Sequence, residues 1–435
     1  MVTSAKDDST AVRDDRAGPR NTWRLVTDPQ FGGVFWGKFF SFAGVTVHTL
    51  VISVLAYQAT GSTTAVAVAN TALYAPQFLL GPWSGAVSDR GWAVVQIVVG
   101  RATCGGGVAA LALWLAFAEQ SEGWAEVGVI SVTAFVAGVG LAIGSAAMNS
   151  LVPQLVTRDE MPLAMTLNTA PLTVARVAGP VLGAWVLAAF GPVAALWVAA
   201  GGHFVFAAAV ALARPDAGPK LPRTPQGSVR VAWRYVRRED RVLLRLLGGV
   251  ALVGFASEPA FVLAPSYADE LGGGTVEVGL LSASFGLGAA LGMVLGGLAA
   301  GRVAQSRASA AGLVLLAVAA AGCAAAPGFA AAHVAFAVCG VGFTVAMGAL
   351  STLVQLRVPP QLRGRVMALW ILGLVGVRPF VSGLVGVVAD AWSPRVAFAV
   401  VAVLAAFGPV WLRPSRLEAR AGEGPAADKP PKNNA

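Results

Sequence analysis

The stretch from Arg214 to Arg245, RPDAGPKLPRTPQGSVRVAWRYVRREDRVLLR, is the only long polar segment inside the chain. It begins with a Pro- and Gly-rich run that is typical of a linker and ends in basic residues. Six apolar tracts lie on each side of it. Each tract is long enough for a membrane helix, which needs about 20 mostly apolar residues. The sequence therefore predicts an all-α membrane protein of twelve transmembrane helices in two pseudo-symmetric six-helix bundles.

Turn-like compositions, such as Thr60-Gly61-Ser62 and Val358-Pro359-Pro360, separate the tracts. The predicted spans are 34–57, 64–87, 93–117, 127–152, 165–190, 193–213, 243–268, 276–301, 308–326, 331–356, 366–391 and 395–412. The chain accordingly divides into an N-terminal tail, a first bundle, a linker, a second bundle and a C-terminal tail, at 1–33, 34–213, 214–242, 243–412 and 413–435. The loops are too short to hold a soluble catalytic domain.

Composition supports the same class. Of the 435 residues, 56% are hydrophobic and 12% are charged, whereas a soluble domain carries about 25% charged residues. Disorder is excluded by the apolar content. The net charge of +9 does not indicate nucleic-acid binding, because the basic residues are spread over the polar segments and form no single face.

Lysine and arginine positions predict the orientation in the membrane. Most of the 31 basic residues fall in segments that would share one side, four lie within spans, and only Arg395 falls in a loop on the opposite side. Because basic loops stay inside, both termini are expected in the cytoplasm of a multi-pass plasma (inner) membrane protein. Residues 1–33 are polar and do not read as a signal peptide, so tract 34–57 is expected to be an uncleaved span.

The second part of the linker has helical periodicity. Val229, Trp233 and Val236 recur at helical spacing, and the arginines between them point elsewhere. This pattern predicts a short basic amphipathic helix on the inner leaflet, in contact with membrane lipid.

An internal repeat relates the two halves. Offset by 202 residues, Met165 matches Met367 and Arg176 matches Arg378. A mid-span arginine at the same place in both halves indicates a duplicated bundle, which is a known transporter architecture.

Several motifs resemble one family. Residues 85–90 (GAVSDR) match the loop between helices 2 and 3 of the major facilitator superfamily, and residues 101–105 (RATCG) are similar to the start of helix 3 in its exporters. Residues 175–183 (ARVAGPVLG) resemble the exporters' helix 5 signature, and residues 362–366 (LRGRV) the loop before helix 11. The resemblance covers roughly residues 28–412. It is strongest to the drug:proton antiporter branch that contains the enterobactin exporter and macrolide efflux proteins.

This resemblance implies a monomeric secondary transporter that exports a small hydrophobic or amphipathic molecule by alternating access in exchange for protons. Two departures from the pattern are present. Gly91-Trp92-Ala93 follows Arg90 where further basic residues are usual, and the equivalent loop of the second half, at 297–302, has glycine in place of the acid. A non-transporting membrane scaffold or sensor with the same fold therefore stays open as an alternative.

Two motifs are expected to control conformation. The first motif consists of Gly85, Asp89 and Arg90. The carboxylate of Asp89 either stabilises one conformation through charge pairs with the opposite half or only caps the next helix. In Gly179, Pro180 and Gly183, the bend at proline either seals the outer side of the cavity or only lets helices pack. The glycine runs at 138–140 and 286–288 are expected to pack helices.

Glu258 and Arg378 are the charges predicted to lie deepest in the second bundle. Their positions in spans 243–268 and 366–391 place both at a similar depth near the middle of the bilayer. A charge at that depth needs a partner or a wet cavity. Two explanations fit: a permanent structural ion pair, or a pair that breaks while Glu258 takes up a proton and so couples protons to transport.

Three further residues are candidates for the substrate cavity. His48 and Phe42 lie in the first span, which lines the cavity in this fold, and Arg176 could meet an anionic substrate or a carbonyl. For His48 a buried, neutral, hydrogen-bonded histidine is a simpler explanation than a proton relay. Arg101, nearer the helix end, is expected to snorkel to the inner interface.

No enzyme or cofactor signature is present in the sequence. The glycine runs follow no strand, and there is no GxxxxGK[ST] loop, so neither a dinucleotide site nor direct use of ATP is expected. Cys104, Cys323 and Cys339 have no metal or disulfide spacing. We expect no catalytic residue, no metal, no cofactor and no nucleic-acid partner.

Overall fold

The computed structural model describes residues 20–88, 92–118, 122–157, 159–215, 229–238, 240–299, 301–358 and 362–412. All regular elements in these ranges are helices, as predicted. The first half contains α1 (Thr22–Val26), α2 (Pro29–Thr60), α3 (Thr63–Val87), α4 (Ala93–Phe117), α5 (Trp124–Leu151), a 3-10 turn (Val152–Gln154) and α6 (Met161–Ala213). The second half contains α7 (Val229–Arg238), α8 (Arg241–Ser257), α9 (Pro259–Val262), α10 (Ala264–Glu270), α11 (Thr275–Leu298), α12 (Gln305–Ala325), α13 (Phe329–Arg357), α14 (Arg363–Gly376), α15 (Arg378–Ala391), α16 (Pro394–Ala406) and α17 (Gly408–Leu412).

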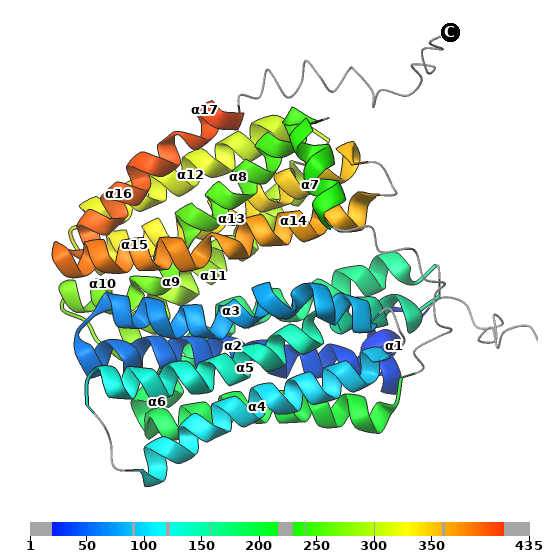
Figure 1. The fold of residues 1–435 in the computed structure, drawn as a ribbon, viewed down its shortest axis with the longest axis horizontal. Coiled ribbons are helices and arrows are strands. Elements are labelled where there is room, and N and C mark those ends of the chain that lie inside the picture. The colour runs from blue at the N-terminus through cyan, green and yellow to red at the C-terminus, as the bar shows by residue number, and fades with distance from the viewer. Residues whose placement is uncertain are drawn as a thin grey trace, which may run out of the picture.

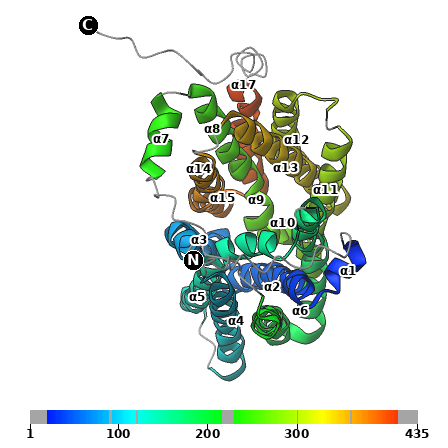
Figure 2. The same cartoon turned by 90° about the vertical axis from the view of Figure 1, so that its right-hand side faces the viewer.

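The helices form two bundles that lie against each other (Figure 1), one of α1 to α6 and one of α8 to α17. Helix α7 packs on α14 and α8 of the second bundle, with Val236 buried and Trp233 exposed. Figure 2, a view along the helices, shows α15 next to α3. The two bundles meet mainly where α3 contacts α15 and where α6 contacts α11.

Ten helices of the described chain are long and apolar enough to cross a membrane. The longest, α6, holds two predicted spans, 165–190 and 193–213, which meet at Gly191 with φ 79°, a conformation that glycine adopts readily. Helix α3 has the length of a span at 25 residues but falls short of the others in apolarity. The reason is that it carries Asn70, Tyr74 and Gln77.

Two predicted spans are bent. Span 243–268 is divided into α8, α9 and α10, and span 366–391 is divided into α14 and α15. Proline follows each main bend, as Pro259 after Glu258 and Pro379 after Arg378. Because proline has no N–H to donate, it removes one helical hydrogen bond from the preceding turn. The backbone at Glu258, Leu263 and Val377 keeps right-handed helical φ/ψ angles, so these are bends within the predicted spans. Arg241–Val262 and Leu369–Ala391 each remain long and apolar enough to cross a membrane.

Glycines allow the helices to approach closely, as predicted for the runs at 138–140 and 286–288. A side-chain carbon on Gly140 would overlap the backbone of Cys104 on α4, and one on Gly288 would overlap the carbonyl of Ala337 on α13. Small residues at such crossings let van der Waals contacts replace the hydrophobic effect, which is weak inside lipid.

An ion-pair cluster holds the described N-terminal segment to the first bundle. The Arg20 Nε atom lies 2.7 Å from Glu160 Oε1, and Arg20 Nη1 lies 2.9 Å from Asp28 Oδ2. Glu160 also accepts a hydrogen bond from the backbone N–H of Thr157 at 3.1 Å. The hydrogen bond from the Arg20 side chain, more than any other contact, lowers the pKa of Glu160 from its ordinary 4.5 to about 2.

We expect Glu160→Gln to destabilise the protein at pH 7 by about 1.5–3 kcal/mol, the range for a hydrogen bond to a charged group. Because the pKa of Glu160 is lowered on folding, the stabilisation is complete above about pH 4.5 and is lost as the pH falls toward 2. Melting temperatures of the purified protein should therefore differ most at pH 7 and converge in acid. Glu122→Gln, at an exposed position of the same bundle, is the control. Equal melting temperatures at pH 7 for Glu160→Gln and the parent protein would contradict this role.

One end of the interface between the bundles is closed by polar contacts. The Asp390 carboxylate accepts hydrogen bonds from Ser62 Oγ at 2.6 Å and from the backbone N–H groups of Thr63 and Thr64 at 2.6 and 3.0 Å. It thereby caps the first turn of α3 from the other bundle, where a negative charge is favoured by the helix dipole. Tyr57 donates to Asp269 Oδ2 across the same interface at 2.9 Å. We call this the Asp390 end of the molecule.

Candidate central cavity

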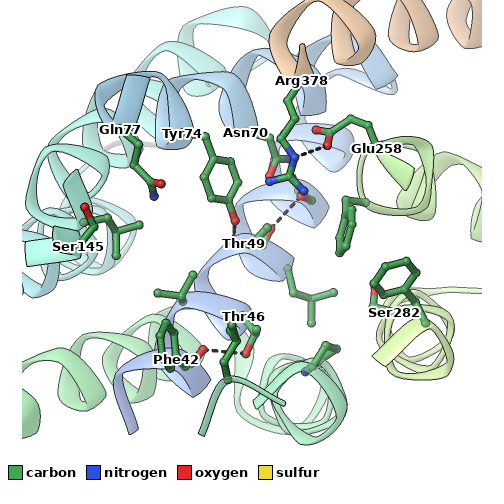
Figure 3. Close-up of a pocket in the computed structure, with 18 of the residues that line it drawn as sticks. Phe42, Thr46, Thr49, Asn70, Tyr74, Gln77, Ser145, Glu258, Ser282 and Arg378 are labelled. Carbon is green, nitrogen blue, oxygen red and sulfur yellow. Dashed lines mark hydrogen bonds and ion pairs between the residues drawn. The ribbon is translucent and has the colours of Figure 1, made fainter. Parts of the chain in front are cut away.

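A cavity of about 500 Å³ lies between the two bundles (Figure 3). Its wall in the first bundle comes mostly from α2, α3, α5 and α6, and its wall in the second bundle from Glu258 and from α9, α10, α11 and α15. The first-bundle side includes Lys38, Phe42, Thr46, Thr49, Asn70, Tyr74, Gln77, Arg101, Ser145 and Asn168. The second-bundle side includes Glu258, Phe261, Ser282, Phe285 and Arg378. Cavities at such an interface are typical binding sites.

Helical spacing explains which side chains face the cavity. Along α2 the lining residues recur every three or four positions, from Lys38 through Phe42 and Val45 to Thr49 and Ser53, which places them on one face. On α3 the same spacing brings Asn70, Tyr74 and Gln77 to the wall, and Figure 3 shows all three beside α2. The polar residues that make α3 less apolar are therefore the residues that line the cavity.

Glu258 and Arg378 form an ion pair in this wall, with 2.7 Å between Arg378 Nε and Glu258 Oε2. The other carboxylate oxygen accepts a hydrogen bond from Ser382 Oγ at 2.9 Å. The Glu258 side chain is 5% exposed, whereas that of Arg378 is 23% exposed. The acid is thus enclosed by the second bundle while the guanidinium reaches the cavity, as seen in Figure 3.

Both charged residues sit where their spans bend. Glu258 lies between α8 and α9, and Arg378 begins α15 directly after the bend at Val377. The prolines that follow them bend the chain there, so each charge stands at a bend within its span. In membranes, backbone groups freed at a bend are tolerated where the helix lines a cavity or is buried in protein.

The arginine also contacts aromatic rings from both bundles. Its guanidinium carbon lies 5.2 Å from the ring centroid of Tyr74 on α3 and 5.6 Å from that of Phe261 on α9. Cation–π contacts of this kind stabilise a partly desolvated guanidinium. Because Tyr74 belongs to the first bundle, the environment of Arg378 depends on how the two bundles are placed relative to each other.

The other predicted cavity residues have different positions. Phe42 lines the cavity. His48 does not: it is buried on another face of α2, and its Nε2 atom has no hydrogen-bond partner among the described residues. The prediction that His48 belongs to the cavity wall is therefore corrected, since position 48 falls about a third of a helical turn away from the lining face. Arg176 lies in α6, but its side chain is outside the described part of the structure.

Of the predicted conformational motifs, only the one on α6 can be described. Gly179 and Gly183 face α2, and a side-chain carbon on Gly179 would overlap Thr46. Pro180 lines the cavity. Contact with the second bundle is made by Gly279 of α11, where an added carbon would overlap Ala184 and lie 2.9 Å from the Pro180 carbonyl. Residues 179–184 thus pack α6 against α2 and also contact the second bundle.

The motif of Gly85, Asp89 and Arg90 stays a prediction. Gly85 lies in α3 but its surroundings are not described, and Asp89 and Arg90 fall outside the described residues.

Sequence reasoning missed two cavity residues. Arg101 does not snorkel: it is 2% exposed and lines the cavity, as does Lys38, which is also 2% exposed. A signal was present, because Lys38 stands four residues before Phe42 on the cavity face of the first span.

Comparison with protein families agrees with this architecture. The model of the Major Facilitator Superfamily matches residues 34–377 and 246–433. Curated relatives include the enterobactin exporter EntS of Shigella boydii, 27% identical over 277 residues, with 63% of this chain and 64% of the relative covered. EntS of Citrobacter koseri matches with the same identity and coverage. The matched region thus spans just under two thirds of these relatives.

Solved structures share the fold at low sequence identity. A POT family transporter in complex with a thioalcohol-conjugated peptide has a TM-score of 0.71 at 10% identity, with 90% of this chain and 96% of that chain covered. A bacterial homologue of the iron transporter ferroportin, in an inward-facing state, has a TM-score of 0.70 at 16% identity, with 90% and 100% covered.

Proposed function

Because the chain belongs to the major facilitator superfamily, we propose that it is a secondary active transporter that exports a small hydrophobic or amphipathic compound across the plasma membrane. The observation that carries the proposal is a cavity of about 500 Å³ between two bundles, with a buried ion pair in its wall. Relatives that are enterobactin exporters support export of a siderophore- or drug-like molecule.

Alternating access is supported by where the bundles touch. Asp390 and Asp269 join the bundles by hydrogen bonds at one end. The distribution of lysine and arginine favours placing both termini in the cytoplasm and the Asp390 end outside. With that orientation, the present arrangement is sealed on the outside, and rocking of the bundles would exchange these contacts for others at the cytoplasmic side.

Proton coupling is assigned to Glu258. Breaking the Glu258–Arg378 pair as the bundles move would be the step that couples a proton to transport, because a carboxyl group without a cationic partner in a poorly hydrated wall generally binds a proton. Because the rings of Tyr74 and Phe261 hold the guanidinium from both bundles, a relative movement of the bundles would change the pair. One proton moving through 100 mV supplies about 2.3 kcal/mol.

We expect cells that express the protein to accumulate less of at least one amphipathic compound than cells that lack it. The screen should include siderophores and drugs, because the proposal covers both. A protonophore should remove the difference, since the gradient supplies the energy. No difference for any compound would instead favour the non-transporting scaffold or sensor. A difference in accumulation that persists with the protonophore would contradict proton coupling but not export.

A further inference from the structure

Two buried cations lie in the cavity and have no acidic partner among the residues that the structure describes. Lys38 on α2 and Arg101 on α4 are each 2% exposed and line the cavity. Lys38 Nζ donates a hydrogen bond to the carbonyl oxygen of Met148 at 2.8 Å and another to the Asn168 side chain. Arg101 donates to Ser41 Oγ at 3.1 Å and to Met148 Sδ at 2.9 Å. Every one of these partners is neutral.

None of the ion pairs between described residues includes Lys38 or Arg101. The acids of these ion pairs have other partners, as Glu160 has Arg20 and Glu258 has Arg378. The Nε atom of Arg101 has no hydrogen-bond partner among the described residues. The guanidinium carbon of Arg101 lies 5.8 Å from the centroid of the Phe206 ring. A buried cation in a membrane protein is expected to have a counter-charge or to serve a function.

The two cationic groups are close to each other because both contact Met148, one at its carbonyl and one at its sulfur. Asn168 and Ser145 stand at the same part of the cavity wall. Among the described residues that line the cavity, the Glu258–Arg378 pair is neutral overall and no second acid is present, so the positive charge of Lys38 and Arg101 is not balanced by them. An anion placed between the ammonium and the guanidinium would complete the set of interactions that the wall leaves open.

The rest of the surroundings suits an apolar body. Phe42, Val45, Leu141 and Leu172 line the cavity near these cations in the first bundle. Lys38 and Arg101 lie in the halves of α2 and α4 that are remote from the Asp390 end. An amphipathic molecule that enters from the side opposite Asp390 would therefore meet the cations before it meets the Glu258–Arg378 pair.

We propose that Lys38 and Arg101 bind the anionic group of the transported molecule, a carboxylate or a similar oxyanion, so that the cavity takes amphipathic anions in preference to neutral or cationic analogues. This inference rests on the proposed transport function and narrows its substrate class.

Binding measurements on the full-length protein test the proposal without requiring transport. In nanodiscs of phosphatidylcholine, the fluorescent probe 1-pyrenebutyrate should bind more tightly than its uncharged amide, by about tenfold or more, as expected for a charge-assisted hydrogen bond. Lys38→Gln and Arg101→Gln should each remove about that factor for the carboxylate. Neither should change binding of the amide more than about twofold.

Charge-retaining variants separate charge from packing. Lys38→Arg and Arg101→Lys should keep most of the preference for the carboxylate, whereas Arg395→Gln, which removes a cation paired with Glu270 at 2.9 Å, should leave it unchanged. If a Gln variant does not fold, the preference of the parent protein for the carboxylate still decides the question.

Three results would overturn the proposal. Equal affinity of the parent protein for the carboxylate and the amide would do so, and so would Gln variants that keep the preference. Loss of probe binding when phosphatidylglycerol is added to the nanodiscs would assign the site to a lipid headgroup instead of a substrate. If the preference is present but cells show no export, the transport function fails and the anion site stands.

Discussion

Glu258→Gln should fold but lose proton-driven efflux. Glutamine has the same size and can still accept the hydrogen bond from Ser382, but it cannot take up or release a proton. Arg378 would then face a neutral partner in every conformation, so the proton gradient could no longer act through the pair. In proteoliposomes with an imposed pH gradient, efflux of the compound found in the accumulation screen should fall to the level of protein-free vesicles.

Stability is the first control for this variant. Breaking a buried ion pair costs about 3–5 kcal/mol, but the Arg378 side chain is 23% exposed toward the cavity, so the loss should be smaller and the protein should still purify as a single species. Exchange of labelled for unlabelled compound without a gradient should also persist, because it needs no proton.

A matched variant tests whether the loss of another carboxylate in the same bundle also stops proton-driven efflux. Glu270 pairs with Arg395 at 2.9 Å in the same bundle and does not line the cavity. Glu270→Gln should therefore keep gradient-driven efflux within about twofold of the parent protein, because this partly exposed ion pair lies away from the cavity. Full efflux by Glu258→Gln under the same gradient would rule out Glu258 as the proton carrier.

Gly279→Leu should prevent the bundles from closing at the Asp390 end and should abolish transport. The first carbon of the new side chain would already overlap Ala184 on α6 and approach the Pro180 carbonyl to 2.9 Å. Because these atoms belong to helices of the opposite bundle, the clash can be relieved only by moving the bundles apart. Overpacking of this kind costs about 1–3 kcal/mol or more, enough to shift a balanced conformational equilibrium about fivefold or more.

The shift can be measured as a distance between spin labels. Phe117 is the last residue of α4 in the first bundle, and Trp392 directly follows α15 in the second. Both are exposed and lie at the Asp390 end. Labels at Phe117→Cys and Trp392→Cys, in a background without the native cysteines, should move apart in Gly279→Leu.

Gly296→Leu is the matched control on the same helix. An added carbon at Gly296 meets nothing within 4 Å, so both the label distance and the transport rate should stay as in the parent protein. An unchanged distance in Gly279→Leu would show that this contact does not hold the bundles together.

The sequence alone predicts the all-helical membrane fold and the contact between Glu258 and Arg378. Apolar tracts separated by turn residues predict the helices because lipid allows little else, and the equal depth of Glu258 and Arg378 predicts their contact. The bends at Glu258 and Arg378 were not predicted, although Pro259 and Pro379 directly follow the two charges. A proline inside an apolar tract does not by itself show how far the helix bends.

The cavity residues were predicted less well, for a geometric reason. Depth in a span follows from counting, but the face of a helix that meets the cavity depends on how it is rotated by its neighbours. His48 and Lys38 share α2, yet only Lys38 reaches the cavity. Arg101 lies near enough to a helix end for snorkelling, and only the positions of Ser41 and Met148 show that it turns inward.

The polar face of α3 has a consequence for biosynthesis. A nascent segment that carries Asn70, Tyr74 and Gln77 enters lipid less readily than its neighbours, because each buried polar group needs a partner that the acyl chains do not offer. Asn70 finds one in Ser53 of α2, at 2.9 Å. Helix α3 should therefore leave the translocon together with α2 as a hairpin, and the chemistry that lets the finished protein hold a solute makes this helix depend on its predecessor during insertion.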